Sequence, residues 1–106
     1  MDTHEQLGFR ALADPTRRDI LHLLAKSEMT IAEVSDNFQM TRAAVKKHLS
    51  ILREGELITV RPSGRTKINA LNAKGLKRVS DWLAYFDTFW DERLAKLKTE
   101  IEKDIQ

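Results

Sequence analysis

The stretch MTRAAVKKHLSILREGEL, residues 40–57, combines basic and apolar residues at a spacing typical of an α-helix. Residues three and four positions apart share one face of a helix, so the apolar stripe must pack against the chain while the basic residues stay outside. Thr41 fits an N-cap and Gly55 lies where the pattern ends, which predicts a helix over residues 41–54. The apolar stripe consists of Val45, Leu49 and Leu52.

The strongest signal for an earlier helix is the dipeptide Asp14-Pro15. Asp caps a helix, and Pro at the first helical position has no amide hydrogen to leave unpaired. The helix is expected to end at about residue 26 and to bury one apolar face. The polar residues expected to face outward are Arg17, Arg18 and Asp19.

Capping boxes predict two more helices, one on each side of residues 15–26. Thr3 with Gln6 fits the start of a first helix, and Thr30 with Glu33 fits the start of a short third helix. The short helix is followed closely by the helix over 41–54, which is the spacing of a helix-turn-helix unit.

The hydrophobic period changes after residue 56. Residues 57–60 and 66–71 are rich in β-branched residues and flank a turn at residues 62–65, which predicts a two-stranded hairpin over residues 57–71. Such a pair of strands is marginal alone and must lean on the helices. A final helical pattern, capped by Asn72, continues past residue 100.

The order of these elements defines the expected fold. It is mainly α with a small β-hairpin, α-α-α-α-β-β-α, and a hairpin directly after a helix-turn-helix is a wing. At 106 residues, the chain is expected to be a single winged helix-turn-helix domain over 1–106. Residues 73–106 are expected to form a long C-terminal dimerisation helix.

Charge is distributed unevenly along the chain. The net charge is only +2, but residues 41–67 hold seven basic and two acidic residues, a net +5, whereas residues 81–106 hold four basic and seven acidic residues, a net −3. This asymmetry indicates that one face meets a polyanion. With no cysteine, no disulfide or thiolate metal site is expected, and no apolar run is long enough for a membrane, so a cytoplasmic protein is expected.

The basic helix and the hairpin tip are expected to contact double-stranded DNA. The major groove admits one α-helix, whose first turns reach the base edges, and Arg42 is placed to bind a guanine. Arg65 at the hairpin tip is placed for the minor groove or the backbone. The alternatives are a solvated basic face and an ordinary exposed turn. The candidate contacts are Thr30, Thr41, Arg42, Ala43, Lys46, Lys47, Ser50, Arg53, Arg61, Arg65 and Lys67.

Most of the chain, about residues 5–90, resembles a known family. The segments that carry the resemblance are FRALADPTRRDILHLL (residues 9–24), TIAEVSDNFQMTRAAVKKHLSILREGELI (residues 30–58), and the SGR and LNAKGL motifs between residues 63 and 76. They are similar to the ArsR/SmtB family of bacterial winged-helix repressors. The resemblance implies a homodimer whose helix from Thr41 enters the major groove, whose wing touches the flanking DNA, and whose repression is relieved by an inducer.

Departures from the family pattern argue against metal sensing. Thr30 and Ala32 stand where many members carry a Cys-x-Cys pair, and no histidine follows His48, so no metal and no cofactor is expected. Gln39 replaces a connector glycine. Gly55-Glu56 replaces the usual Ala-Gly at the end of the recognition helix, which predicts a cap shifted by one residue.

The apolar pattern of the last helix predicts a homodimer. A continuous helix from residue 73 to 101 is about 43 Å long, more than a compact domain of this size covers, so a second copy is the simplest cover for its apolar face. The alternative is a break near Asp87-Thr88, with two shorter helices that pack back on the same chain. The expected interface is Leu7, Phe9, Leu12, Trp82, Phe86, Phe89, Trp90, Leu94, Leu97 and Ile101.

No residue pattern supports catalysis, so the chain is not expected to be an enzyme. The leading function is a homodimeric repressor that binds a palindromic operator, with a possible unknown inducer and no membrane contact. One alternative is a winged-helix module that binds protein. A third hypothesis is a sensor that holds a small molecule between its C-terminal helices.

Overall fold

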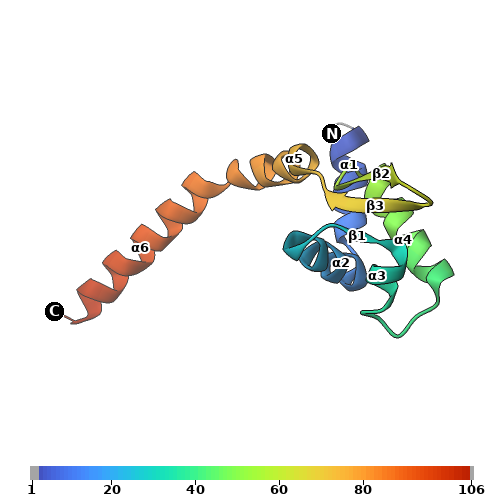
Figure 1. Ribbon diagram of the computed structural model, residues 1–106. Helices are drawn as coiled ribbons and strands as arrows, with labels where there is room; N and C mark the ends of the chain where they lie inside the picture. The colour runs from blue at the N-terminus through green and yellow to red at the C-terminus, as the bar shows by residue number, and fades with distance from the viewer. Residues whose placement is uncertain (1–2, 106) are drawn as a thin grey trace.

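The computed structural model describes residues 3–105, with side chains for residues 3–104. These residues form a winged-helix body from which the C-terminal helix extends (Figure 1). In chain order the elements are α1 (Thr3–Leu12), α2 (Pro15–Lys26), β1 (Met29–Thr30), α3 (Ile31–Ser35), α4 (Arg42–Glu54), β2 (Ile58–Ser63), β3 (Thr66–Leu71), α5 (Ala73–Ala84) and α6 (Asp87–Ile105).

The caps predicted for α2, α3 and α4 are confirmed. Asp14 caps α2, Thr41 caps α4 through a hydrogen bond from the Ala44 amide, and Thr30 with Glu33 forms a complete capping box on α3. The predicted cap of α1 is wrong, because Thr3 is already helical. None of the helices in the described range is long and apolar enough to cross a bilayer.

The wing is larger than the predicted two-stranded hairpin. β1 joins it, so the sheet has the antiparallel order β1-β3-β2, and the buried Asn69 side chain donates from Nδ2 to the Met29 carbonyl oxygen at 3.2 Å. The turn is also tighter, with Gly64-Arg65 alone between the paired residues Ser63 and Thr66. Gly64 has φ 61°, which suits the first position of a type II′ turn.

The core lies where α1, α2, α3, α4 and the sheet meet. The predicted apolar stripe of α4 is buried, with Val45 and Leu52 fully inaccessible and Leu49 at 6%. The α4 helix is therefore fixed from inside, and its basic side is left on the surface. The other fully or almost fully buried large side chains are Ile20, Val34, Leu57 and Ile58.

The end of α4 is locked by close backbone contacts. Gly55 is its C-cap with φ −76°, and Glu56 takes the left-handed φ of 58°. The predicted shift of the cap by one residue is therefore wrong. The Leu57 amide donates to the Leu52 carbonyl oxygen at 3.0 Å, which completes a Schellman motif. A Cβ on Gly55 would lie 2.8 Å from the Leu7 carbonyl oxygen, so glycine is used there for close packing on α1.

The C-terminal pattern forms two helices, with a break at residues 85–86. The prediction of one continuous helix is wrong, and the alternative of a break is correct to within two residues. The second part of that alternative is wrong, because α6 does not pack back: it leaves the body (Figure 1), and every residue from 80 to 104 is exposed. The resulting molecule measures 68 × 31 × 20 Å.

Candidate nucleic-acid interface

A groove of about 550 Å³ lies between α4, the β2–β3 hairpin and the start of α3. Its floor includes the buried Leu49 and Asn69, and basic side chains stand along its rim. The fold thus brings together residues from three separate parts of the sequence. Seven of the candidate DNA contacts line this groove: Thr30, Arg42, Lys46, Ser50, Arg53, Arg65 and Lys67.

The rim of the groove carries an uncompensated positive charge. No acidic side chain lines it, and none of its basic residues makes an ion pair with any residue in the described range. A groove lined by one sign of charge concentrates its field and attracts a polyanion. The rim cations are Arg42, Lys46, Arg53, Arg65 and Lys67.

Three other candidates belong to α4 or its cap but lie outside the groove lining. Ala43 and Lys47 are exposed on α4, and Thr41 is exposed at its start. The Thr41 hydroxyl already accepts a hydrogen bond from the Ala44 amide at 3.1 Å, and Thr30 makes the equivalent bond to the Glu33 amide at 3.2 Å. The hydroxyl oxygens of both threonines are therefore already engaged in capping a helix.

Arg61 is placed differently from the other candidates in the wing. Its guanidinium forms a two-pronged ion pair with Glu28, with Nη1 2.8 Å from Oε2. The hydrogen bond from Arg61 lowers the pKa of Glu28, and the same bond raises the pKa of Arg61. Successive side chains of a strand alternate between its two faces, so Arg61 points away from the face that Val60 turns to the groove.

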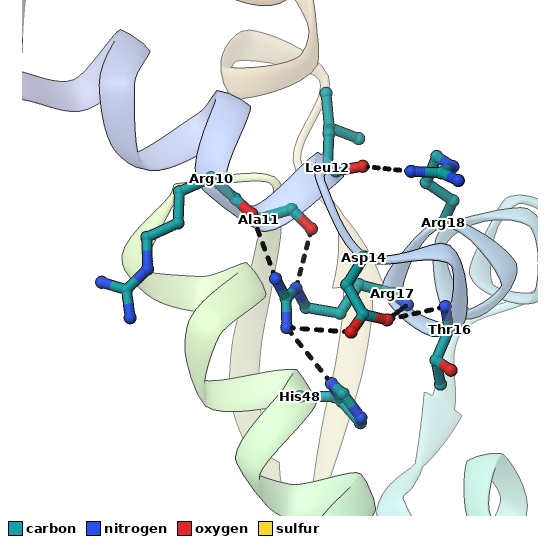
Figure 2. A network of polar contacts seen from close by, with 8 residues as sticks. All are labelled: Arg10, Ala11, Leu12, Asp14, Thr16, Arg17, Arg18 and His48. Atoms are coloured by element: carbon teal, nitrogen blue, oxygen red, sulfur yellow. Dashed lines mark hydrogen bonds and ion pairs between the residues drawn. The ribbon is translucent and has the colours of Figure 1, made fainter.

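Arg17 supports the interface from behind, although the sequence predicts an outward side chain (Figure 2). Its side chain is 11% exposed, and it donates to the carbonyl oxygens of Ala11 at 2.8 Å and Arg10 at 3.1 Å. Its Nη1 also lies 3.4 Å from Nδ1 of His48 on α4. Because a guanidinium has no acceptor, Nδ1 of His48 accepts this bond. The outward prediction is wrong because Arg17 closes the carboxyl end of α1.

Asp14 and Arg18 complete this junction between α1 and α2 (Figure 2). Oδ1 of Asp14 accepts from the amides of Thr16 at 2.7 Å and Arg17 at 3.3 Å. Burial raises the pKa of Asp14, but the backbone hydrogen bonds and the charge of Arg17 outweigh it and lower the pKa. Arg18 donates to the Leu12 carbonyl oxygen at 2.7 Å. Charged side chains thus fix the helices behind α4 without lying in the groove.

The residues predicted to form the dimer interface divide into two groups. Leu7, Phe9 and Leu12 of α1 are partly buried, and the last two pack on the chain's own core. The ring of Phe9 meets Trp82 edge-on with centroids 5.3 Å apart, and Trp82 contacts Phe86 at 5.1 Å. The remaining residues are on α6 and are open to solvent, with exposed fractions of 50% to 61%: Phe89, Trp90, Leu94, Leu97 and Ile101.

Thr30 and Ala32 occupy the two positions at which the family resemblance would place a Cys-x-Cys metal pair. Thr30 and Ala32 both line the groove. Among the residues that the structure describes, no group of three or more histidine or acidic side chains is arranged to hold a metal ion.

Comparisons with known proteins place this geometry in a family. Residues 14–60 match the model of the bacterial regulatory protein, arsR family. The transcriptional repressor SdpR of Bacillus subtilis is 33% identical over 78 residues, which cover 74% of this chain and 87% of SdpR.

Solved structures show the same fold. The crystal structure of an ArsR family transcriptional regulator is 31% identical with a TM-score of 0.76, over 83% of this chain and 97% of that one. A homodimeric winged helix-turn-helix DNA-binding domain from Mycobacterium bovis has a TM-score of 0.65 at 24% identity, over 86% of this chain and 82% of its own. The chain is therefore a member of the ArsR family of winged helix-turn-helix transcriptional regulators.

Proposed function

We propose that the chain is a homodimeric repressor that binds a palindromic operator in double-stranded DNA. The observation that carries the proposal is the groove between α4 and the wing, with five cations on its rim and no acidic residue in its lining. SdpR, a similar protein over most of its length, is a transcriptional repressor. A dimer seated on an operator represses by blocking access to the promoter, and we place this action in the cytoplasm, where bacterial DNA lies.

The position of each basic residue on α4 or on the wing indicates which part of the DNA it would contact. Arg42 begins α4, so it reaches the base edges when that end enters the major groove and can bind a guanine through two hydrogen bonds. Lys46 and Ser50 follow on the same side of α4, and Arg53 in its last turn suits a phosphate. Arg65, at the tip of the wing, suits the backbone or the minor groove.

The dimer is supported by apolar surface that one chain leaves uncovered. Leu94 and Leu97 are 61% and 53% exposed, and Trp90 is 60% exposed, which is unusual for large apolar side chains on one helix face. A C2 pair covers the same patch on both copies. The Mycobacterium bovis domain of the same fold is homodimeric, so the fold is compatible with pairing. Two equivalent recognition helices read an inverted repeat, with half-sites about 34 Å apart or a multiple of that.

Duplex binding as a function of salt tests the proposal. Fluorescence anisotropy should be recorded with a duplex taken from upstream of the protein's own reading frame and with a scrambled duplex of equal length. The logarithm of the association constant should fall with the logarithm of salt concentration at about 0.9 per phosphate neutralised, up to about 9 for five rim cations in each of two chains. Equal affinity for both duplexes, or no salt dependence, would contradict sequence-specific binding by this face.

A further inference from the structure

The groove between α4 and the wing combines two kinds of surface. All five rim cations have exposed side chains. Below them, four apolar residues of the lining are buried or half-buried: Ile31, Ala32, Leu49 and Val60. These four come from α3, α4 and β2, so apolar surface from three elements meets beneath the charges. The groove is therefore apolar at its floor and cationic at its rim.

A DNA backbone explains the rim of this groove but not its apolar floor. Phosphates are hydrated anions, and they bind to cations and polar groups at the edge of a binding face. Apolar side chains that remain in contact with water favour an apolar group that displaces this water. The floor therefore offers contacts that a phosphate backbone does not use.

The groove also has room for a small molecule. Its volume of about 550 Å³ is within the roughly 300–1,000 Å³ that is usual for small-molecule sites, which combine an apolar lining with a few convergent polar groups. Ser50 adds a hydroxyl to the lining, and this hydroxyl makes no hydrogen bond with any group in the described range. Volume, floor and rim together fit a ligand with an apolar body and a negative charge.

We infer that the groove binds an amphipathic organic anion, with its apolar body on the floor and its head group among the rim cations, and that this ligand displaces operator DNA. The inference rests on the proposed function and adds the site and the chemical class of a regulatory ligand. Carboxylate and phosphate head groups both suit the site, because each accepts paired hydrogen bonds from a guanidinium. The bound anion neutralises rim charge where DNA would bind, so the two ligands exclude each other.

Cinnamate is a suitable probe, because it joins a flat apolar body to a carboxylate. Its roughly 11 non-hydrogen atoms correspond to a dissociation constant on the order of 1 mM. Acetate has the head group alone and cinnamyl alcohol has the apolar body alone, so each should bind at least about tenfold more weakly. Titrations of the full chain followed by ¹⁵N–¹H NMR measure all three affinities. Equal affinity for cinnamate and cinnamyl alcohol would show that the rim cations take no part, and would overturn the inference.

The same titration locates the probe on the molecule. The largest shifts should occur at amides of the groove lining, such as those of Ile31, Ala32 and Ser50. The exposed apolar face of α6 is the competing site, because it also offers apolar surface to an organic ligand. Shifts confined to residues 89–101 would place cinnamate there, and would overturn the inference.

Ala32→Phe fills the floor without removing a rim cation. Ala32 lines the groove, so the added ring should occupy the place of the apolar body and weaken cinnamate binding at least about tenfold. Ala95→Phe is the matched control: it makes the same change at an exposed position of α6, outside the groove, and should alter the affinity less than twofold. Unchanged binding to Ala32→Phe would overturn the inference. Circular dichroism checks that both variants fold, and the shifts in the unaltered chain test the site independently of them.

Competition with DNA separates this inference from the proposed function. At constant ionic strength, cinnamate at about nine times its dissociation constant should raise the apparent dissociation constant of the upstream duplex by about tenfold or more. Acetate at the same concentration should change it less than twofold. DNA binding that does not respond to saturating cinnamate overturns the inference and leaves the proposed repressor intact. A chain that takes up cinnamate in the groove but binds no duplex overturns the proposed function, and the regulatory role with it.

Discussion

The helices α4 and α6 are both amphipathic, but only α4 is completed by its own chain. The apolar face of α4 is buried, with Val45 and Leu52 fully inaccessible, whereas Leu94 and Leu97 of α6 are more than half exposed. Caps, a Schellman motif and the Arg17 junction hold α4 in place. The difference shows that the proposed DNA-binding surface is built within one chain, while the apolar face of α6 is left uncovered by that chain.

The largest expected effect is a loss of stability when the close packing just after the end of α4 is disturbed. A Cβ on Gly75 would lie 1.7 Å from the carbonyl oxygen of Glu56, directly after α4. Gly75→Ala should therefore lower the free energy of unfolding by about 3 kcal/mol, as measured by urea denaturation. Gly8→Ala is the control, because its Cβ meets nothing closer than 3.5 Å, and it should be neutral or stabilising by up to about 1 kcal/mol. Equal effects of the two changes would contradict the packing account.

The next effect concerns the junction behind α4. Arg17→Met keeps much of the side-chain bulk but removes the donors to Arg10 and Ala11, so it should cost about 2 kcal/mol of stability in the same assay. The control is Arg18→Met, which removes one donor to the Leu12 carbonyl oxygen at an exposed site and should cost less than about 1 kcal/mol. If Arg18→Met proved the more damaging, the support of α4 would not depend on Arg17.

Within the groove, Arg42 should determine sequence preference. Arg42→Ala should lose about 1–3 kcal/mol of discrimination at one base position in each half-site, while binding to unrelated DNA falls much less. Affinities for a set of duplexes with single base changes measure this directly. Discrimination that is unchanged at every position would remove Arg42 from base recognition.

The smallest effects separate two arginines of the wing. Arg65→Ala should weaken binding to all duplexes by about the same factor, roughly threefold to tenfold, and reduce the salt slope by about 0.9 per chain. Arg61→Ala should leave both quantities nearly unchanged, because Arg61 is paired with Glu28 on the other side of the hairpin. The reverse ranking would show that Arg61 leaves Glu28 to bind DNA.

Local sequence signals predicted the parts of the fold that local chemistry determines. Asp14-Pro15 and the pair Thr30 and Glu33 mark helix starts because the capping bonds join residues two or three positions apart. The order of the expected elements then predicted the winged helix-turn-helix fold, and the family resemblance added the expectations of a homodimer and an inducer.

The features that sequence reasoning missed depend on distant contacts. β1 is only two residues long, too short to show the alternation of apolar and polar residues that marks a strand. It forms because it pairs with β3 and accepts a hydrogen bond from Asn69. Arg17 and His48 are 31 positions apart, and Arg61 and Glu28 are 33 apart, so no local pattern indicates either contact. The break at residues 85–86 contains neither Gly nor Pro, the usual signals for one, so the sequence offered a break near Asp87-Thr88 only as the alternative to a continuous helix.

The stoichiometry of the complex on operator DNA tests the central claim most directly, because it requires both a basic reading surface and pairing. Sedimentation equilibrium with a duplex containing the upstream inverted repeat should give two chains per duplex, and a duplex with one half-site altered should bind far more weakly. A single chain bound tightly to one half-site, with no gain from the second, would contradict a regulator that reads DNA as a symmetric pair.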